Sequence, residues 1–419
     1  MEGEPSQNKN ASSAQSKKYR SVRFGLALVV LLAMPVGHYL WLETEPDQFR
    51  PLFVVEKPGI GAVRALSGPT VGTEHRQVQT PEFVKGIYMT ANTAGYKKRF
   101  NQLIDLVDRT EINALVIDIK GHNGHLAFTP ESPELKPYAS ENIYLGDLKE
   151  FTAPLKERGI YLIARQFVFQ DPQFAEAHPE WAVANTWGGL WRDYRGIPWL
   201  DAASKDVWRY NVQIAREVFD GGFDEIQFDY IRFPSDGNIK AAEFPVWDGT
   251  TPKSEVMAGF FAYLDKELRV KNGIPISVDL FGLTMWQHDY DLNIGQLLRD
   301  ALPHFDFISP MVYPSHYPPG FNGYANPAEH PYEVVYENLV RGQAVYEQIN
   351  QAAVDQGMDP PPLATIRPWI QDFDLGAVYT PERVRAQFTA TEDGGGSGWL
   401  IWNARNVYTE GAFELAPAD

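Results

Sequence analysis

The chain has 419 residues, a hydrophobic content of 44% and a formal net charge of -17. This length can hold two ordinary domains or one large α/β barrel of about 250 residues with insertions, and the apolar content is ample for a core. The negative charge argues against nucleic acid or an anionic membrane surface as the main partner, because the long-range field would repel both. The absence of cysteine excludes disulfides, thiolate metal sites and cysteine nucleophiles.

The N-terminal segment has the pattern of an export signal. Residues 1–23 are polar and basic, so we expect a disordered tail, and the apolar run 24–42 would span roughly 28 Å as a helix, barely enough for a bilayer. Basic residues before this run and acidic residues after it place the rest of the chain outside the cytoplasm. A cleaved signal peptide is the alternative, but no clear small-x-small cleavage site follows residue 34.

We therefore predict a transmembrane signal anchor that contacts the lipid bilayer, then a linker over residues 43–80, rich in Pro, Gly, Thr and charge. The globular domain would begin at residue 81 and run to residue 419, in the periplasm or outside the cell. It would be secreted if the N-terminal segment is cleaved. The sequence does not set an oligomeric state.

From residue 81 onward, short apolar runs alternate with segments of helical period. The runs that predict strands are 83–89, 114–119, 160–164, 225–229, 276–280, 307–312, 363–366 and 399–402. The intervening segments that predict helices are 97–109, 147–158, 207–219, 255–270, 332–351 and 381–390. Eight such alternations predict a closed (β/α)8 TIM barrel in a single domain. An open doubly wound sheet is the alternative, but residues 90–95 are not a glycine-rich phosphate turn.

In such barrels the working residues lie at the carboxyl ends of the strands and on the loops that follow. Position alone therefore selects the candidates. They are Tyr88, Thr90, Asp118, Lys120, Arg165, Gln166, Asp229, Tyr230, Arg232, Asp279, Tyr313, His316, Arg367, Trp369, Trp402 and Asn403. Three carboxylates, three arginines and several aromatic rings at one mouth are too polar for packing alone.

Two carboxylates across a barrel mouth are the equipment for cleaving a glycosidic bond, one as a general acid and one as a nucleophile or base. Asp229 and Asp279 close adjacent strands, so we predict Asp229 as nucleophile or base and Asp279 as general acid. Asp118 is the third catalytic candidate, and it could equally accept a hydrogen bond from substrate or pair with an arginine. For each of these aspartates, a salt bridge lining the top of the barrel is the alternative.

Two aromatic loops favour a sugar as the ligand. The loop 181–201 interleaves five large aromatic residues with glycines and charges, and Trp187 and Trp191 are its candidates for stacking on a sugar ring. Packing of such rings against the barrel flank is the alternative. The second loop, 313–332, holds His316 among five prolines and predicts a rigid lid over the same mouth.

Metal ligation is a weaker reading. His122 and His125, or His288 with Asp289 and Asp291, could be written as ligands, but their spacing is unspecific and solvated loop histidines are commoner. The sequence has no serine elbow, P-loop or dinucleotide fingerprint. We therefore expect no metal and no cofactor.

Five motifs, in order, resemble a bacterial family of glycosyl hydrolase domains that is named from its barrel rather than from a defined reaction. They are V-K-G-I-Y-M-T-A-N-T-A-G at 84–95, L-V-D-R-T-E-I-N-A-L-V-I-D-I-K at 106–120, F-D-E-I-Q-F-D-Y-I-R-F-P at 223–234, I-S-P-M-V-Y-P-S-H-Y at 308–317 and R-P-W-I-Q-D-F at 367–373. The resemblance covers residues 81–405 and implies a barrel of the glycoside hydrolase superfamily, without a defined substrate.

Two more distant likenesses touch only the strand-four motif. The α-amylase-type barrels have an aspartate nucleophile at the end of strand four, which corresponds to Asp229, but they use a glutamate at strand five where this chain has Asp279. The chitinase-type motif carries a glutamate two residues past its last aspartate, and here that position is Ile231. The resemblance therefore disfavours the chitinase mechanism and leaves the acid open.

The first functional hypothesis is a membrane-anchored glycoside hydrolase that acts on an extracytoplasmic polysaccharide. The second is a non-catalytic protein of the cell envelope that binds carbohydrate on the same scaffold. A third, a metal-dependent deacetylase or hydrolase, would lose activity with a chelator.

Overall fold

The computed structural model of the chain describes residues 78–142 and 144–416. The predicted tail 1–23 and anchor 24–42 lie outside these residues, as does the predicted linker 43–80 except for its last three positions. Within the described ranges, no helix combines the length and the apolar character needed to cross a bilayer.

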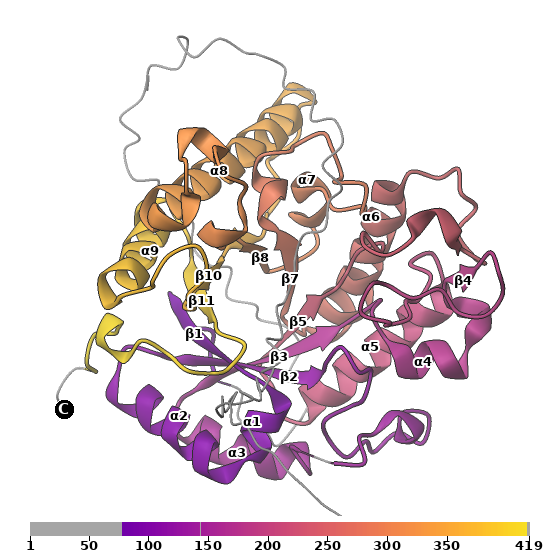
Figure 1. The fold of residues 1–419 in the computed structure, drawn as a ribbon, viewed down its shortest axis with the longest axis horizontal. Coiled ribbons are helices and arrows are strands. Elements are labelled where there is room, and N and C mark those ends of the chain that lie inside the picture. Colours follow the sequence, from indigo (N-terminus) through magenta and orange to yellow (C-terminus); the bar gives the residue numbers. More distant parts are fainter. Residues whose placement is uncertain (1–77, 143, 417–419) are drawn as a thin grey trace, which may run out of the picture. The chain divides into compact units, whose positions relative to one another are not determined.

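Parallel strands close into a barrel (Figure 1). The sheet order is β10, β11, β1, β2, β3, β5, β7, β8, β9, and an additional pairing of β10 with β8 completes the ring. The strands are β1 Val84–Met89, β2 Ala114–Lys120, β3 Tyr161–Phe167, β5 Glu225–Asp229, β7 Ile276–Phe281, β8 Phe307–Met311, β9 Thr365–Ile366, β10 Trp369–Gln371 and β11 Gly398–Trp402. The closed parallel barrel predicted from the sequence is confirmed.

The seventh strand of the barrel is interrupted. The apolar run 363–366 predicts one strand, whereas the structure has β9 and β10 separated by Arg367 and Pro368. The register with β8 is the same on both sides of the break, because Ile308 is level with Ile366 and Met311 with Trp369. Proline has no N–H to donate to a ladder, so the break follows from Pro368. The strand therefore continues past the predicted end and carries Trp369 into the barrel.

Helices cover the outside of the barrel. Their bounds are α1 Ala91–Gly95, α2 Lys97–Arg109, α3 Leu148–Glu157, α4 Pro172–Ala177, α5 Lys205–Asp220, α6 Lys253–Leu264, α7 Leu298–Ala301, α8 Pro331–Asp355 and α9 Pro381–Asp393. The six helices predicted from periodicity are present, and α6 continues into a π-helical stretch, Asp265–Val270. The short helices α1, α4 and α7 were not predicted, because segments of one turn or two show no period.

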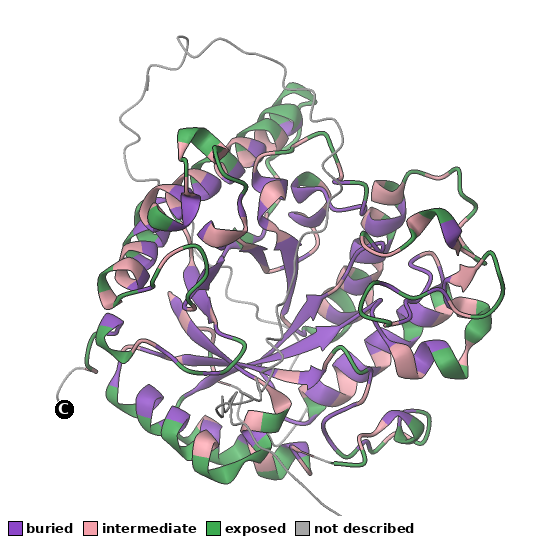
Figure 2. Ribbon diagram, in the orientation of Figure 1, coloured by how far each residue is buried: buried purple, intermediate pink, exposed green. Residues whose placement is uncertain are grey.

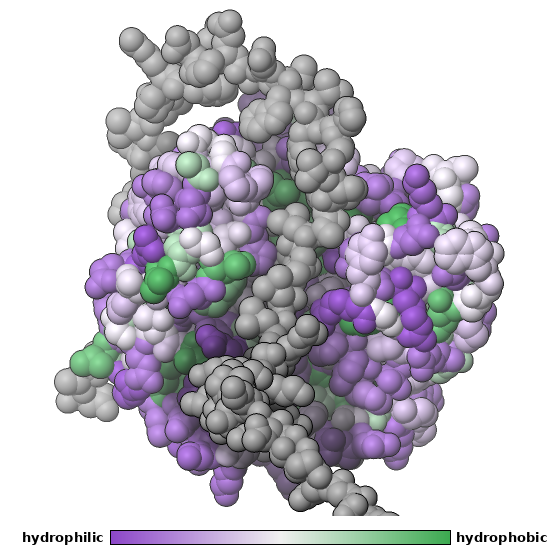
Figure 3. Space-filling view, viewed as in Figure 1, coloured by the Kyte–Doolittle hydropathy of each residue, from purple (hydrophilic) through white to green (hydrophobic). Residues whose placement is uncertain are grey.

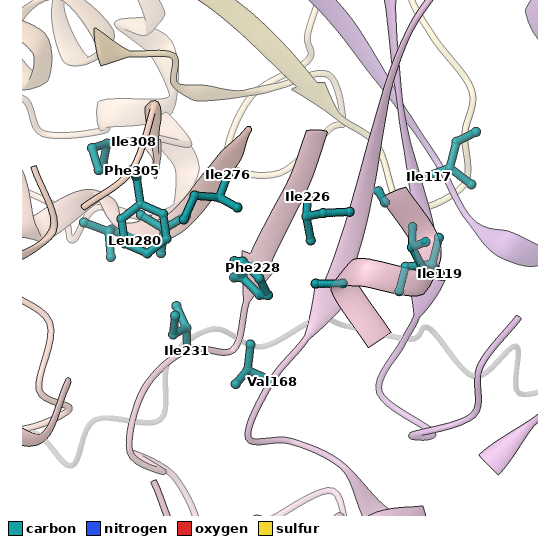
Figure 4. Packing of buried hydrophobic residues seen from close by; sticks show 14 of the residues in the cluster. Ile117, Ile119, Val168, Ile226, Phe228, Ile231, Ile276, Leu280, Phe305 and Ile308 are labelled. Carbon is teal, nitrogen blue, oxygen red and sulfur yellow. The ribbon is translucent and has the colours of Figure 1, made fainter. Parts of the chain in front are cut away.

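Alternation along each strand separates two cores. Ile226 and Phe228 on β5, and Ile276 and Leu280 on β7, point outward and belong to the large cluster beneath the helices (Figure 4). A second, smaller cluster includes Val84, Val116, Ile163 and Leu400, and it fills one side of the barrel interior. Because both strand faces are buried, the strands read as near-continuous apolar runs (Figure 2).

The described surface is mostly polar. The face seen in Figure 3 is mostly hydrophilic, and its hydrophobic side chains form small, separate groups. A short antiparallel pair, β4 (Ala184–Asn185) with β6 (Ala242–Glu243), joins the predicted aromatic loop to the segment that follows β5.

The other side of the barrel interior is polar and holds a fully buried ion pair. Arg367 Nη1 and Nη2 donate to Glu225 at 3.0 and 2.5 Å, and both residues have 0% side-chain exposure. Tyr161 Oη and Ser277 Oγ donate to the same carboxylate at 3.0 and 2.5 Å. Glu225 is the first residue of β5, so this cluster lies at the opposite end of the strand from Asp229.

Replacement of Arg367 by alanine should lower the free energy of unfolding by about 3–5 kcal/mol, because it leaves the Glu225 carboxylate buried without a counter-ion. Urea denaturation measures the change. The control is Arg109→Ala, which removes an exposed ion pair with Glu410 and should cost less than about 1 kcal/mol. Equal effects of the two substitutions would contradict the structural role of Arg367.

Candidate active site

Asp229 ends β5 in a strained turn. Tyr230, the next residue, has φ 51°, a left-handed conformation that is rare for an aromatic residue. Its N–H donates to Asp229 Oδ1 at 2.6 Å, and its ring stacks on Phe167 with centroids 4.2 Å apart. Strained backbone of this kind concentrates at functional sites, where surrounding contacts hold it in place. The turn thus fixes the direction of the Asp229 carboxylate.

Arg165, on β3, lies at the centre of the site and joins the three predicted catalytic carboxylates. Its Nη1 is 2.7 Å from Asp118 Oδ1 on β2, and its Nη2 bonds Asp229 Oδ2 on β5. Its Nε is 3.5 Å from Asp279 Oδ2 on β7, within ion-pair range but without a hydrogen bond. The guanidinium is buried, and its Cζ lies 4.7 Å from the Phe167 ring centroid and 5.0 Å from that of Trp402.

The three carboxylates differ in exposure. The side chain of Asp118 is 13% exposed and that of Asp229 is 7% exposed, whereas that of Asp279 is 1% exposed. Trp369 Nε1 donates to Asp279 Oδ1 at 2.7 Å, and Asp279 Oδ2 has no hydrogen-bond partner in the described part of the chain. Asp118 Oδ2 accepts from Tyr88 Oη at 2.5 Å.

Burial and charge separate the protonation behaviour of these groups. Burial, together with the negative charge of Asp229, holds the pKa of Asp279 well above its ordinary value, although Arg165 and Trp369 act in the opposite direction. Burial also raises the pKa of Asp118, against the pull of Arg165. The charges of Asp229 and Asp118 raise the pKa of Arg165 well above its ordinary value in spite of its burial, so it stays a cation.

Aromatic rings enclose this network. Tyr88 and Trp402 stack with centroids 4.1 Å apart, and Trp369 meets both rings edge-on. Tyr313 belongs to the same interior cluster as Tyr88 and Trp369. His316 follows, with its ring centroid 5.2 Å from that of Tyr313, and burial lowers its pKa to about 4. His316 is therefore neutral at physiological pH.

Several of the predicted site residues lie away from the carboxylates. Lys120 Nζ pairs with the buried Asp171 at 2.8 Å, and the Gln166 amide donates to Asn211 Oδ1 at 2.8 Å. Arg367 is bound to Glu225 at the other end of β5. The Asn403 amide bonds the carbonyls of Asp372 and Val407, so it holds the loop after β11. Trp191 is buried and donates to the Asn238 carbonyl at 2.8 Å, whereas Trp187 is 79% exposed at a turn beside β4.

Arg232 adjoins the network on the side of the aromatic loop. Its Cζ lies 4.8 Å from the Trp199 ring centroid and 5.0 Å from that of Phe281. Its Nη1 donates to the Phe233 carbonyl and to Ser235 Oγ. Arg232 therefore fixes the chain that leaves Asp229.

Three residues near the site were not among the predicted catalytic or sugar-binding residues, although His122 was considered as a metal ligand. Phe167 and Phe281 are the last residues of β3 and β7, and longer predicted strands would have included both among the strand ends. His122 lies near Asp118, Arg165 and Arg195, whose charges act on it, and burial is the main cause of its lowered pKa. Within residues 78–142 and 144–416, no group of three His, Asp or Glu side chains is placed to hold a metal ion.

Comparisons with known proteins agree with this architecture. Residues 86–408 match the family described as "Putative glycosyl hydrolase domain". No curated protein matches the sequence. Among solved structures, a hypothetical protein from Ruminiclostridium thermocellum is 35% identical over 46% of this chain and 96% of that chain, with a TM-score of 0.42.

The glycoside hydrolase domain of PgaB (BpsB) from Bordetella bronchiseptica has a TM-score of 0.53. It is 14% identical, over 78% of this chain and 95% of that chain. At this identity the likeness shows a shared fold.

Replacement of Arg165 by methionine should destabilise the protein in a pH-dependent way. Without the cation, the buried carboxyls must keep their protons in the folded state, so their pKa values rise and stability is lost as pH increases above about 4. Thermal unfolding from about pH 4 to pH 8 should show a deficit relative to the parent chain that grows to about 3–5 kcal/mol.

The control for this series is Arg192→Met, which removes an exposed pair with Glu176 and should leave the pH dependence unchanged. A deficit of Arg165→Met that is constant across the pH range would show that the guanidinium acts through packing instead of charge.

Proposed function

We propose that this chain, which belongs to the glycosyl hydrolase domain family, hydrolyses glycosidic bonds of an extracytoplasmic polysaccharide with the carboxyl groups of Asp229 and Asp279. The observation that carries the proposal is the contrast between these two groups on adjacent strands. Phe228 is level with Val278, so Asp229 and Asp279 follow at the same height. One is bound by a guanidinium, and the other is buried with a raised pKa.

Charge balance requires one of the carboxyls to keep a proton. Three ionised carboxylates and one guanidinium would give the buried cluster a charge of -2. A buried excess charge is costly, and the most deeply buried carboxyl is the one that stays neutral. Asp279 meets that condition, so it is the proton donor for the leaving oxygen, as glycosidic cleavage requires.

Asp229 is the complementary group. Arg165 and the Tyr230 N–H stabilise its negative charge and fix its orientation. It is thus poised to attack the anomeric carbon or to activate water. Asp118, held by Tyr88 and Arg165, is the partner that sets the position of the guanidinium.

The aromatic cup supports a sugar as the substrate. Trp402 is partly exposed beside the carboxylates and stacks on the buried ring of Tyr88, and pyranose rings offer apolar C–H faces that stack on such surfaces. Hydroxyl groups of the sugar would bind the polar atoms between the rings.

A second candidate function, carbohydrate binding without cleavage, is favoured by one observation. Arg165 contacts all three carboxylates, and Asp279 is almost completely buried, which is also the pattern of a structural ion cluster. A binding protein would bind the sugar through the aromatic rings of the site, and the carboxylates would only stabilise the fold.

The substitution Asp229→Asn separates the two functions. For a hydrolase it should lower the rate of release of reducing ends from cell-wall glycan by a factor of about 10²–10⁴. Asp279→Asn should have a similar effect and should also remove the loss of activity at high pH that we expect of the parent chain as Asp279 deprotonates. Reducing-end assays across pH measure both.

The control is Asp206→Asn, an exposed surface change on α5 that should leave activity as it is. Saturable glycan binding by the parent chain without any release of reducing ends, unaffected by Asp229→Asn, would establish the second candidate instead.

The proposed location rests on the apolar run 24–42 and its flanking charges. In membrane fractionation of cells that express the full chain, the protein should sediment with membranes. A chain that lacks residues 1–42 should stay in the soluble fraction. Equal partition of both chains would contradict the anchor, and a mature N-terminus after residue 34 would support a cleaved signal.

A further inference from the structure

A separate cavity of about 410 Å³ lies on the face of the barrel where the active site lies. It is formed by the segment 247–254, which follows β5, and by the segment 289–299, which follows β7. Loops that follow the strands lie at the carboxyl end of a parallel barrel, which is also the end that bears Asp229 and Asp279. The volume is within the range of small-molecule sites, about 300–1,000 Å³.

The lining of this cavity suits a neutral, hydroxyl-rich ligand. Trp247 and Tyr290 contribute aromatic rings, and Tyr290 is 55% exposed. Two cations, Lys253 and Arg299, are matched by two carboxylates, Asp289 and Asp291, so the lining has no net charge. Aromatic rings together with paired polar groups recognise sugars better than ions.

The polar groups of the cavity are held in place before any ligand binds. Arg299 Nη1 is 2.5 Å from Asp289 Oδ1. Lys253 Nζ donates to the carbonyl and the side-chain oxygen of Asn293 at 2.8 and 3.1 Å. Asn293 and the preceding Leu292 have φ of 58° and 54°, and consecutive left-handed residues of this kind persist only where contacts enforce them.

Trp247 is fixed by hydrogen bonds and packs on the segment that follows Asp229. Its indole N–H donates to the Thr251 carbonyl at 2.9 Å, and its backbone N–H donates to Asp201 Oδ2 at 3.0 Å. Its ring meets Phe233 with centroids 5.2 Å apart. Phe233 follows Asp229 by four residues, a span of at most about 14 Å. The cavity and Asp229 are therefore separated by a short length of chain, a distance that several linked sugar units can span along the surface.

We propose that this cavity is a distal subsite that binds one neutral sugar unit of a chain whose other units reach the carboxylates. This inference rests on one part of the proposed function, which is that the ligand is a glycan. It does not require that the glycan is cleaved. It defines the ligand as an oligosaccharide or longer polymer, because a monosaccharide could not occupy both places.

The test uses the full-length chain with Asp229→Asn, so that binding is read without turnover. The probes are N-acetylglucosamine oligomers and cello-oligomers, from the disaccharide to the hexasaccharide, in isothermal titration calorimetry. In at least one series the hexasaccharide should bind about tenfold more tightly than the disaccharide. Addition of Tyr290→Ala should remove about this factor for the hexasaccharide and leave disaccharide affinity unchanged.

Two further variants keep the test decisive. Trp247→Ala should lower hexasaccharide affinity as Tyr290→Ala does. The Trp247 indole is packed, so its loss could unfold the loop. Tyr290 is exposed, so Tyr290→Ala tests the subsite without that risk. Tyr96→Ala, an equally exposed tyrosine beside α2, is the matched control and should change nothing.

Equal affinity for short and long oligomers, absence of binding in both series, or an unchanged length dependence in Tyr290→Ala would each overturn the subsite. Failure of the hydrolase proposal looks different. In that case the length dependence and its loss in Tyr290→Ala are observed, but the parent chain with Asp229 intact releases no reducing ends.

Discussion

The carboxyl end of this barrel, called the upper end below, is held together by a single buried cation. Arg165 receives carboxylates from β2, β5 and β7, so one side chain ties four strands together at the end where the loops begin. The surrounding rings of Phe167, Trp402 and Tyr88 exclude water and add cation–π attraction. In such a low-dielectric setting, burial of each charge is costly. The guanidinium compensates the cost of burying the carboxylates, and the carboxylates compensate the cost of burying the guanidinium.

The two buried ion clusters differ in how many hydrogen-bond donors their carboxylates meet. In the lower cluster, the ion pair of Glu225 and Arg367 at the start of β5, each oxygen of Glu225 accepts from two donors. Neither side chain of this pair is exposed. In the upper cluster Asp279 Oδ2 has no donor within the described residues, while Asp118 and Asp229 keep some exposure. A saturated carboxylate can only stabilise the fold. A carboxylate with spare hydrogen-bonding capacity can take a proton, give one up or bind a hydroxyl.

Sequence patterns predicted the barrel well because its strands are buried on both faces, which makes them apolar almost throughout. They failed where the interior is polar. The run that predicts β3 stops at residue 164, yet the strand continues through Arg165 and Gln166 to Phe167, since the arginine finds its partners inside the barrel. Strand-end position selected Asp118, Asp229, Asp279 and Arg165, which the structure does bring together.

The same rule also selected Arg367, whose partner Glu225 is 142 residues away in the chain. Only the register of distant strands shows which carboxylate an arginine meets, and a single sequence does not contain that register. Position along one strand therefore identified the polar candidates but could not separate the residue that pairs with Glu225 from those that meet around Arg165.

The break between β9 and β10, which the sequence analysis did not predict, places Trp369 beside Asp279. Pro368 interrupts the seventh strand, but the register with β8 is kept, so Trp369 lies level with Met311 and directs its indole inward. That indole N–H then occupies Asp279 Oδ1, which leaves Oδ2, 3.5 Å from Arg165 Nε, without a hydrogen bond among the described residues. A donor on one oxygen lowers the pKa of a carboxyl, and burial beside Asp229 raises it more. The balance raises the pKa of Asp279 while the indole fixes the orientation of its carboxyl, and these are the two properties that the proposed general acid needs.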